Sequence, residues 1–161
     1  MMERVNRILK HEVFQDNLEK IKKAEHERIF CCHDMVHFLD VARIGMILNL
    51  QENLQIPEDL LYAAALLHDI GKHEQYSAGT PHEKASARIA PGILKDCGYT
   101  TEEIKMITDA ILLHRTMDIA KEPDLNGILY RADKASRACF ACAEEKNCNW
   151  KNDRKNLKLW I

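Results

Sequence analysis

The segment LLYAAALLHDIGK, residues 60–72, constrains the fold most, because an apolar run leads directly into three polar groups. A helix that is apolar all round is normally buried by its neighbours. This run is far shorter than the roughly 20 residues that span a bilayer. His68, Asp69 and Lys72 follow at once, and burying such groups is costly unless each has a partner. The segment therefore predicts a buried helix that ends in a polar site.

The rest of the chain also carries apolar residues at helical spacing, and no segment alternates convincingly as a strand. We therefore predict an all-α fold, a compact bundle of about six helices. The first helix is expected over residues 5–21 and the second from about residue 33 to 53. Pro57 opens the apolar helix, which is expected to stop near Gly71.

Three further helices complete the expected bundle. The sequence TPHE at residues 80–83 fits a capping box with proline at the first helical position, and its helix should run to Cys97. The sequence TTEE at residues 100–103 repeats this pattern for a helix that reaches His114. The last helix should cover about residues 125–143.

Length and charge limit the classes of protein that this chain can belong to. A chain of 161 residues, 46% of them hydrophobic, can bury a sizeable core without disulfides. A net charge of −2 predicts neither a nucleic acid duplex nor an anionic membrane as partner. The charged N-terminus does not resemble a signal peptide, so a cytoplasmic location is expected. The oligomeric state cannot be predicted from the sequence.

Histidines and acids occur on five of the expected helices and are candidate metal ligands. Imidazole nitrogens with carboxylate oxygens suit iron, manganese, zinc, nickel or cobalt, and helical bundles build such sites between facing helices. Any one of these residues could instead be a core or surface group, and His11, His26 and His73 are interpreted in that way. The combination favours a metal site. The candidates are His37, His68, Asp69, His82, His114 and Asp133.

Four separated motifs resemble, in the expected order, the HD-domain superfamily of metal-dependent phosphohydrolases. They are HFLDVARI at residues 37–44, HDIGK at 68–72, His114, and YRAD at 130–133. The resemblance implies a single HD-type domain over residues 1–161, with a core at about 28–140. The N-terminal helix and the polar C-terminal tail would be extensions of that core.

The same resemblance implies how the candidate ligands divide between ions. His37, His68, Asp69 and Asp133 would hold one divalent ion, and Asp69 would bridge to a second. His82 and His114 stand where binuclear members hold that second ion, so two ions are expected. The alternative is a mononuclear enzyme in which these two histidines bind substrate phosphate.

Lys72 and three neighbours of the motifs are candidates for substrate chemistry. The pattern HDxxK looks like the binuclear branch of the superfamily, whereas a glutamate tends to follow the pair in mononuclear nucleotidases. Lys72 would neutralise a phosphate oxygen, and Asp69 would orient the attacking water or accept its proton. A solvated lysine near the C-terminus of a helix is the alternative for Lys72. The further candidates for substrate binding are Arg115, His33 and Arg137, of which His33 could also be a ligand and Arg137 could simply pair with an acid.

The resemblance implies hydrolysis of a phosphoester or phosphoanhydride in a nucleotide or related small molecule. The chain lacks the HDxxED run of alarmone hydrolases and the DGxGYP stretch of cyclic di-GMP enzymes. AILLHR and LYRADKASR make it partly similar to small diadenosine tetraphosphate hydrolases. The alternative is a catalytically weak module of the same fold that senses a nucleotide or binds a partner.

Three cysteines near the C-terminus form a second candidate metal site. Cys139, Cys142 and Cys148 could supply thiolates to zinc or an iron–sulfur cluster, with Cys31 or Cys32 as a fourth ligand. Buried cysteines often serve only as small hydrophobic groups, and that interpretation stays open.

Overall fold

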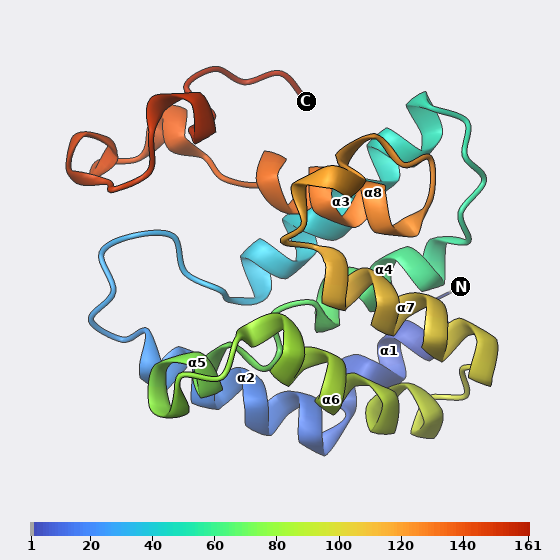
Figure 1. Ribbon diagram of the computed structural model, residues 1–161. Helices are drawn as coiled ribbons and strands as arrows, with labels where there is room; N and C mark the ends of the chain where they lie inside the picture. The colour runs from blue at the N-terminus through green and yellow to red at the C-terminus, as the bar shows by residue number, and fades with distance from the viewer. Residues whose placement is uncertain (1) are drawn as a thin grey trace.

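In the computed structural model, which describes residues 2–161, the chain forms α-helices and short 3-10 helices without any β-strand in that range (Figure 1). This confirms the all-α prediction. The α-helices are α1 (Glu3–Lys10), α2 (Glu12–Ala24), α3 (Met35–Gln51), α4 (Glu58–Leu67), α5 (Lys72–Ala78), α6 (His82–Asp96), α7 (Thr101–Leu113) and α8 (Leu125–Ala135). The 3-10 helices are η1 (Met117–Lys121), η2 (Cys139–Ala141), η3 (Glu145–Asn147) and η4 (Asn152–Arg154).

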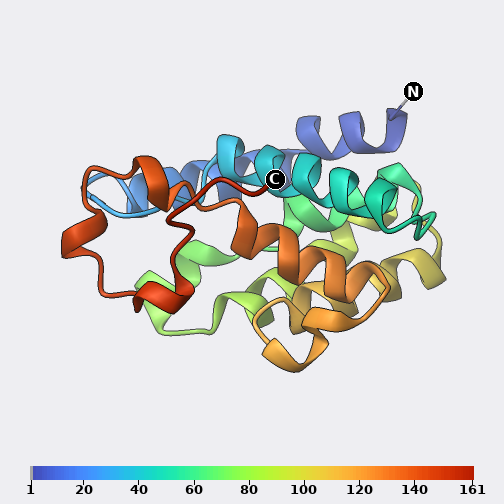
Figure 2. The ribbon, with the colours of Figure 1, turned by 90° about the horizontal axis from the view of Figure 1, so that it is seen from above.

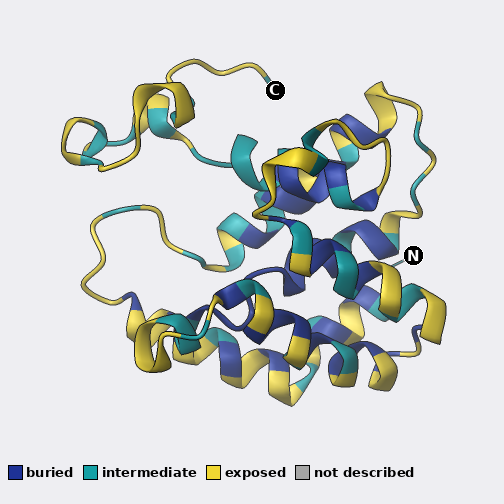
Figure 3. Cartoon of the chain, in the orientation of Figure 1, coloured by how far each residue is buried: buried dark blue, intermediate teal, exposed yellow. Residues whose placement is uncertain are grey.

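Helix α4 is the buried centre of the bundle, as its apolar sequence predicts. It packs against α1, α3, α6, α7 and α8, and Leu66 and Leu67 have no exposed surface. The buried residues gather at this centre, while the outer faces of the surrounding helices are exposed (Figure 3). The end of α4, and with it the HDIGK segment, is therefore enclosed by neighbouring helices.

The first expected helix is two helices, α1 and α2, which meet at His11. The backbone of His11 is extended, and its Nδ1 accepts a hydrogen bond of 3.2 Å from the Val13 amide, which caps α2. A side chain that satisfies a free amide in this way favours a new helix start. Both helices pack on the bundle, since Ile8 and Phe14 are fully buried in the common core.

Gly71 lets the turn after α4 approach α6 closely. A Cβ atom at this position would lie 2.5 Å from the Ser86 amide nitrogen and 2.6 Å from the Ala85 Cβ. The Gly71 amide instead donates a hydrogen bond of 2.9 Å to the Ser86 hydroxyl. Helix α5, which the sequence analysis did not anticipate, begins directly after this turn.

The two predicted capping boxes have different outcomes. At α7 the box of Thr100 and Glu103 is present, with both reciprocal hydrogen bonds. At α6 the prediction is wrong, because Pro81 is itself the N-cap and no side chain caps the helix. His82 is therefore the first helical residue.

Helix α8 ends at Ala135, eight residues before the predicted end at Ala143, so that part of the prediction is wrong. No residue after Ala132 belongs to the buried hydrophobic core of residues 2–161, so a longer helix would have no partner to cover it. The chain leaves the bundle here, and the tail of residues 136–161 extends beyond it (Figures 1 and 2). Within the described part of the chain, none of the helices is long and apolar enough to cross a membrane.

Candidate metal centre

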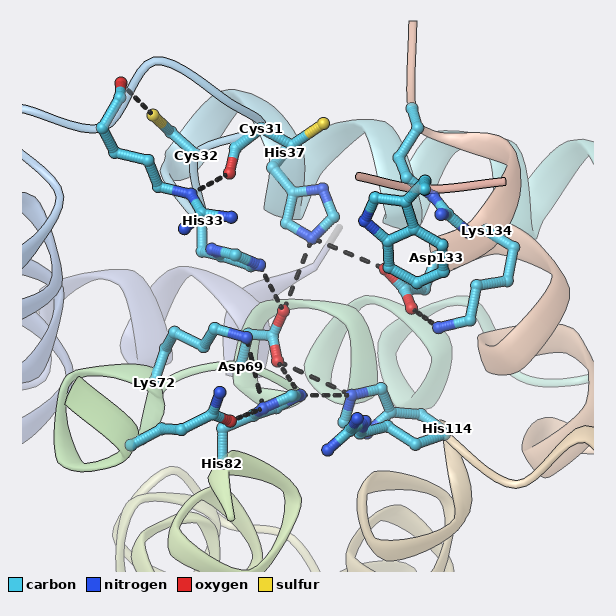
Figure 4. Close-up of a pocket in the computed structure, with 15 residues that line it drawn as sticks. Cys31, Cys32, His33, His37, Asp69, Lys72, His82, His114, Asp133 and Lys134 are labelled. Carbon is cyan, nitrogen blue, oxygen red and sulfur yellow. Dashed lines mark hydrogen bonds and ion pairs between the residues drawn. The ribbon is translucent and has the colours of Figure 1, made fainter. Parts of the chain in front are cut away.

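All six candidate metal ligands meet at the end of α4, and Figure 4 shows five of them, His37, Asp69, His82, His114 and Asp133. His68 and Asp69 lie in the turn that follows this helix, and the other four come from the surrounding helices. His37 lies on α3, His82 begins α6, His114 follows α7 and Asp133 lies on α8. Three overlapping groups have ligand atoms within 4.8 Å of one another. These are His37–His68–Asp69, His68–His114–Asp133 and Asp69–His82–His114.

Asp69 faces a different pair of histidines with each of its carboxylate oxygens. Oδ2 lies 3.2 Å from Nε2 of His68 and 3.7 Å from Nε2 of His37. Oδ1 lies 3.1 Å from Nε2 of His82 and 3.6 Å from Nε2 of His114. One carboxylate thus stands between two nitrogen sets, the arrangement that a carboxylate bridge between two ions requires.

The His37 and His68 rings point their Nε2 atoms at each other across 3.3 Å. Nδ1 of His68 donates to the Ala65 carbonyl at 2.7 Å, so its hydrogen is on Nδ1 and Nε2 has a lone pair. The Ser136 hydroxyl donates to the Asp133 carbonyl at 2.8 Å and accepts from Nδ1 of His37 at 3.3 Å. Two lone pairs therefore face each other, with Oδ1 of Asp133 3.7 and 3.8 Å from the two nitrogens.

The His82 and His114 rings repeat this arrangement on the other side of Asp69. Their Nε2 atoms are 3.2 Å apart, and Nδ1 of His114 donates to the Ile111 carbonyl at 2.6 Å. Nδ1 of His82 lies 2.6 Å from Oε1 of Gln75. Burial lowers the pKa of His82 to about 3, so its ring is neutral at neutral pH.

These side chains fit divalent metal ions. Oδ1 of Asp69 is buried without a hydrogen-bond partner among residues 2–161, which is a costly state for a carboxylate oxygen. Burial raises the pKa of Asp69, but the histidines, with His68 first, outweigh it and hold the pKa well below its ordinary value. Burial likewise raises the pKa of Asp133, and Lys134 chiefly reverses this, so the pKa is lowered. Ionised carboxylates with neutral imidazoles are the donor set that such ions bind.

Lys72 lies beside this cluster instead of in solvent. It is the first residue of α5, so it stands at the start of a helix and not at the C-terminus of α4. The residue is 8% exposed, and its Nζ lies 3.2 Å from Nδ1 of His82. Burial is the main cause that lowers the pKa of Lys72. Its ammonium group is therefore held at the wall of the site.

His33 approaches Asp69 from the loop before α3. Its Nε2 lies 3.7 Å from Oδ2 of Asp69, and its Nδ1 donates to Oε1 of Glu25 at 2.5 Å. Burial raises the pKa of Glu25, but the hydrogen bond and charge of His33 lower it to about 2. The Tyr76 hydroxyl also donates to Glu25, at 2.6 Å. Neither Glu25 nor Tyr76 lies within a motif, so the sequence alone does not mark them.

A pocket of about 260 Å³ opens over these residues and contains both predicted arginines. Arg115 pairs with Glu83 through Nη1 and Oε2 at 3.4 Å. Arg137 stacks on Trp150, with its guanidinium carbon 4.5 Å from the ring centroid. Trp150 reaches the pocket from the tail and was not foreseen, since nothing in its local sequence marks it.

Comparisons with known proteins identify the family and the fold of the chain. The family model described as "HD domain" matches residues 35–138. A protein of Clostridium beijerinckii whose description is "uncharacterized protein" is 43% identical over 159 residues, 99% of each chain. The fold is also similar to the crystal structure of a predicted HD superfamily hydrolase from an uncultured Thermotogales bacterium. That match has a TM-score of 0.62 and 22% identity, and it covers 89% of this chain and 81% of the other.

Proposed function

This chain belongs to the HD domain family, and we propose that it is a phosphohydrolase that uses two divalent ions to act on a nucleotide or related small phosphorylated molecule. The observation that carries the proposal is the position of Asp69 between two histidine pairs. Each of its oxygens faces one pair, and the buried Lys72 stands beside the same cluster. The whole chain, residues 1–161, would act as one such domain.

The two ions would be held by sets of residues that share Asp69. His37, His68 and Asp133 complete the first set, and His82 and His114 complete the second. When bound, divalent ions such as iron, manganese, zinc, nickel or cobalt polarise phosphoryl oxygens and lower the pKa of water. The backbone carbonyls that accept from His68 and His114 keep those Nε2 atoms free to bind.

Asp69 and Lys72 are the residues to which we assign catalytic roles. The pKa of Asp69 is well below its ordinary value, so its carboxylate is charged and can orient the attacking water or accept its proton. Nζ of Lys72 can place its charge beside a phosphoryl oxygen as negative charge develops there. Attack at phosphorus breaks the bond to the leaving oxygen and releases an alcohol or a phosphate.

The pocket wall supports a substrate with both phosphate and an aromatic base. One arginine guanidinium group can bind two phosphate oxygens at once. Arg115 and Arg137 both line the pocket. Aromatic side chains stack on bases, and Trp150 offers an indole face at the same wall. His33, held by Glu25, is the third proposed contact, either to substrate or to the metal beside Asp69.

A substrate panel tests this proposal. Purified protein with Mn²⁺ or Fe²⁺ would be assayed on p-nitrophenyl phosphate, its bis ester and dinucleotide polyphosphates, with Asp69→Ala as the inactive control. We expect metal-dependent turnover of at least one nucleotide substrate that is lost in the control. Tight binding of a nucleotide with no turnover of any compound would contradict the proposal and favour the sensing module.

A further inference from the structure

The cysteines from the two ends of the sequence lie around one pocket, although more than a hundred residues separate them. Cys31 belongs to the loop between α2 and α3, whereas Cys139, Cys142 and Cys148 belong to the tail. All four, together with Cys32 beside Cys31, line a pocket of about 430 Å³ next to the candidate metal centre. Figures 1 and 2 show this loop and the tail on the same side of the bundle.

The tail needs a source of stability other than a hydrophobic core. After Ala132, no hydrophobic side chain up to residue 161 is buried, and several large ones are exposed, Phe140 and Trp150 among them at 48% each. Three short 3-10 helices make up its regular structure. Its contacts include the partly buried Ile161 at the chain end and hydrogen bonds from the Asn156 amide to the carbonyls of Lys134 and Arg137 at 2.7 and 2.9 Å. Segments too small to bury a core are typically held by disulfides or metal ions.

The local backbone suits thiolate ligands. Cys139 is the first residue of the single turn of η2 and Cys142 follows its last residue, so that the Cys142 amide donates to the Cys139 carbonyl at 3.3 Å. Cys148 follows directly after η3. A CxxC turn with further cysteines from other segments is the pattern of structural zinc sites.

We propose that Cys31, Cys139, Cys142 and Cys148 bind one structural zinc ion, which joins the tail to the loop before α3. This inference does not depend on the proposed phosphohydrolase activity. Binding would replace the thiol protons of the four cysteines with one Zn²⁺. Among residues 2–161 the groups that already lie at ligand distance contain only histidine and aspartate, so the ion must draw the four sulfur atoms together. The pocket between them leaves space for that movement.

Charge around the pocket is compatible with a zinc tetrathiolate. Arg137 and Lys155 line it, and their positive charges oppose the two negative charges of such a centre, although Asp34, Asp40 and Glu145 line it as well. Lys155 donates to the Glu145 carbonyl at 2.7 Å, which ties η3 to the end of the tail.

The two adjacent loop cysteines provide an internal control. The thiols of Cys31 and Cys32 point in opposite directions in Figure 4, and that of Cys32 faces the Arg28 carbonyl at 4.0 Å. Cys32 also lines the pocket, but its thiol donates to the Phe30 carbonyl of its own loop at 3.5 Å. Only Cys31 should therefore be a ligand.

Cobalt spectroscopy separates this site from the histidine centre, because thiolate-to-cobalt charge-transfer bands require sulfur ligands. Reduced protein loaded with Co²⁺ should show these bands, and Zn²⁺ should displace them. Cys142→Ser and Cys31→Ser should abolish or strongly weaken them. Cys32→Ser and the buried Cys97→Ser should leave them unchanged. Circular dichroism of each variant would check that the helices remain folded.

A second measurement covers variants that fold poorly. Zinc bound to the wild-type protein should protect four of the six cysteines from a thiol reagent and the tail from trypsin, and a chelator should remove both kinds of protection. Absence of thiolate bands together with free reaction of Cys31, Cys139, Cys142 and Cys148 in the reduced wild type would overturn the proposal. An equal loss of the thiolate bands in Cys32→Ser and Cys31→Ser would also overturn the proposal. So would purified protein that contains iron and inorganic sulfide at this site in place of zinc.

Discussion

Oδ1 of Asp69 lies 3.1 Å from Nε2 of His82, yet this buried oxygen has no hydrogen-bond partner in the described chain. A native protein seldom leaves a carboxylate oxygen in that state without a metal or water to satisfy it. The other oxygen of Asp69 faces His68 at 3.2 Å. These two contacts support the proposal that the carboxylate of Asp69 is shared by two ions.

Lys72→Met tests the role of the buried ammonium group. The substitution keeps an aliphatic chain and removes the charge, so turnover should fall by about a hundredfold to a thousandfold, as for other lost electrostatic contacts in active sites. Metal content should stay unchanged. Lys84→Met, at an exposed position of α6, is the matched control and should keep full activity. Undiminished turnover in Lys72→Met would refute this role.

Glu25→Gln tests whether the carboxylate that holds His33 supports the site. The variant retains the size of the side chain but loses the charge opposite Nδ1 of His33. Outer partners of metal-site histidines typically contribute about 10-fold to 100-fold to affinity or activity, and a loss in that range is expected. Titration with Mn²⁺ and assay of turnover would measure it. The exposed Glu27→Gln should behave as wild type, and identical behaviour of the two variants would count against the prediction.

Gly71→Ala tests the close approach of the HDIG turn to α6. Because the new methyl group would meet the Ser86 backbone at 2.5 Å, the free energy of unfolding should fall by about 1–3 kcal/mol. Gly92→Ala is the control, since a Cβ there has no neighbour within 4 Å. That change should raise stability by about 0.5–1 kcal/mol. Denaturant unfolding measures both, and equal effects would argue against the steric explanation.

The free energy of unfolding should depend on pH through Glu103 of α7, which pairs with Arg4 of α1. Its contact with Arg4, 2.7 Å from Nη1 to Oε2, is the main cause that lowers its pKa below the ordinary 4.5. A carboxyl with a lowered folded-state pKa stabilises the fold above its unfolded pKa, and this contribution is lost as pH falls through the folded value. Glu103→Gln should therefore cost about 0.2–1 kcal/mol at neutral pH and progressively less below pH 4.5.

Treating the protein with a chelator separates the contribution of the Arg4–Glu103 ion pair from the effect of metal binding on stability. The unfolding free energies of wild type and Glu103→Gln would be compared from neutral to acid pH, with the exposed Glu102→Gln as control. A difference that stays constant with pH would show that the ion pair is not its source.

Most helices could be predicted because they depend on local patterns, and the candidate ligands could be predicted because their motifs resemble those of HD domains. The apolar run before His68 requires burial, and the charged groups after it require partners, whatever the rest of the chain does. The break at His11 was missed because the apolar spacing continues across it, and only the cap reveals it. The end of α8 was misplaced because it depends on where neighbouring helices stop covering it.

Features that depend on distant segments could not be predicted. Glu25 serves His33 because the loop between α2 and α3 folds back, and no motif encodes that path. Trp150 lines the pocket only because the tail returns to it. The false capping box at Thr80 has a different cause, since Pro81 adopts an extended backbone and takes the cap position itself.

Elemental analysis of four proteins after identical purification tests the central claim most directly. Wild type, His82→Ala and His114→Ala would be compared with Asp69→Ala, each in a Cys142→Ser background so that the proposed tail site does not contribute. The account predicts about two ions per chain in the parent, about one in each histidine variant and close to none without Asp69. About one ion in both the parent and His82→Ala would contradict the binuclear centre. His82 and His114 would then be candidates for binding substrate phosphate instead of metal.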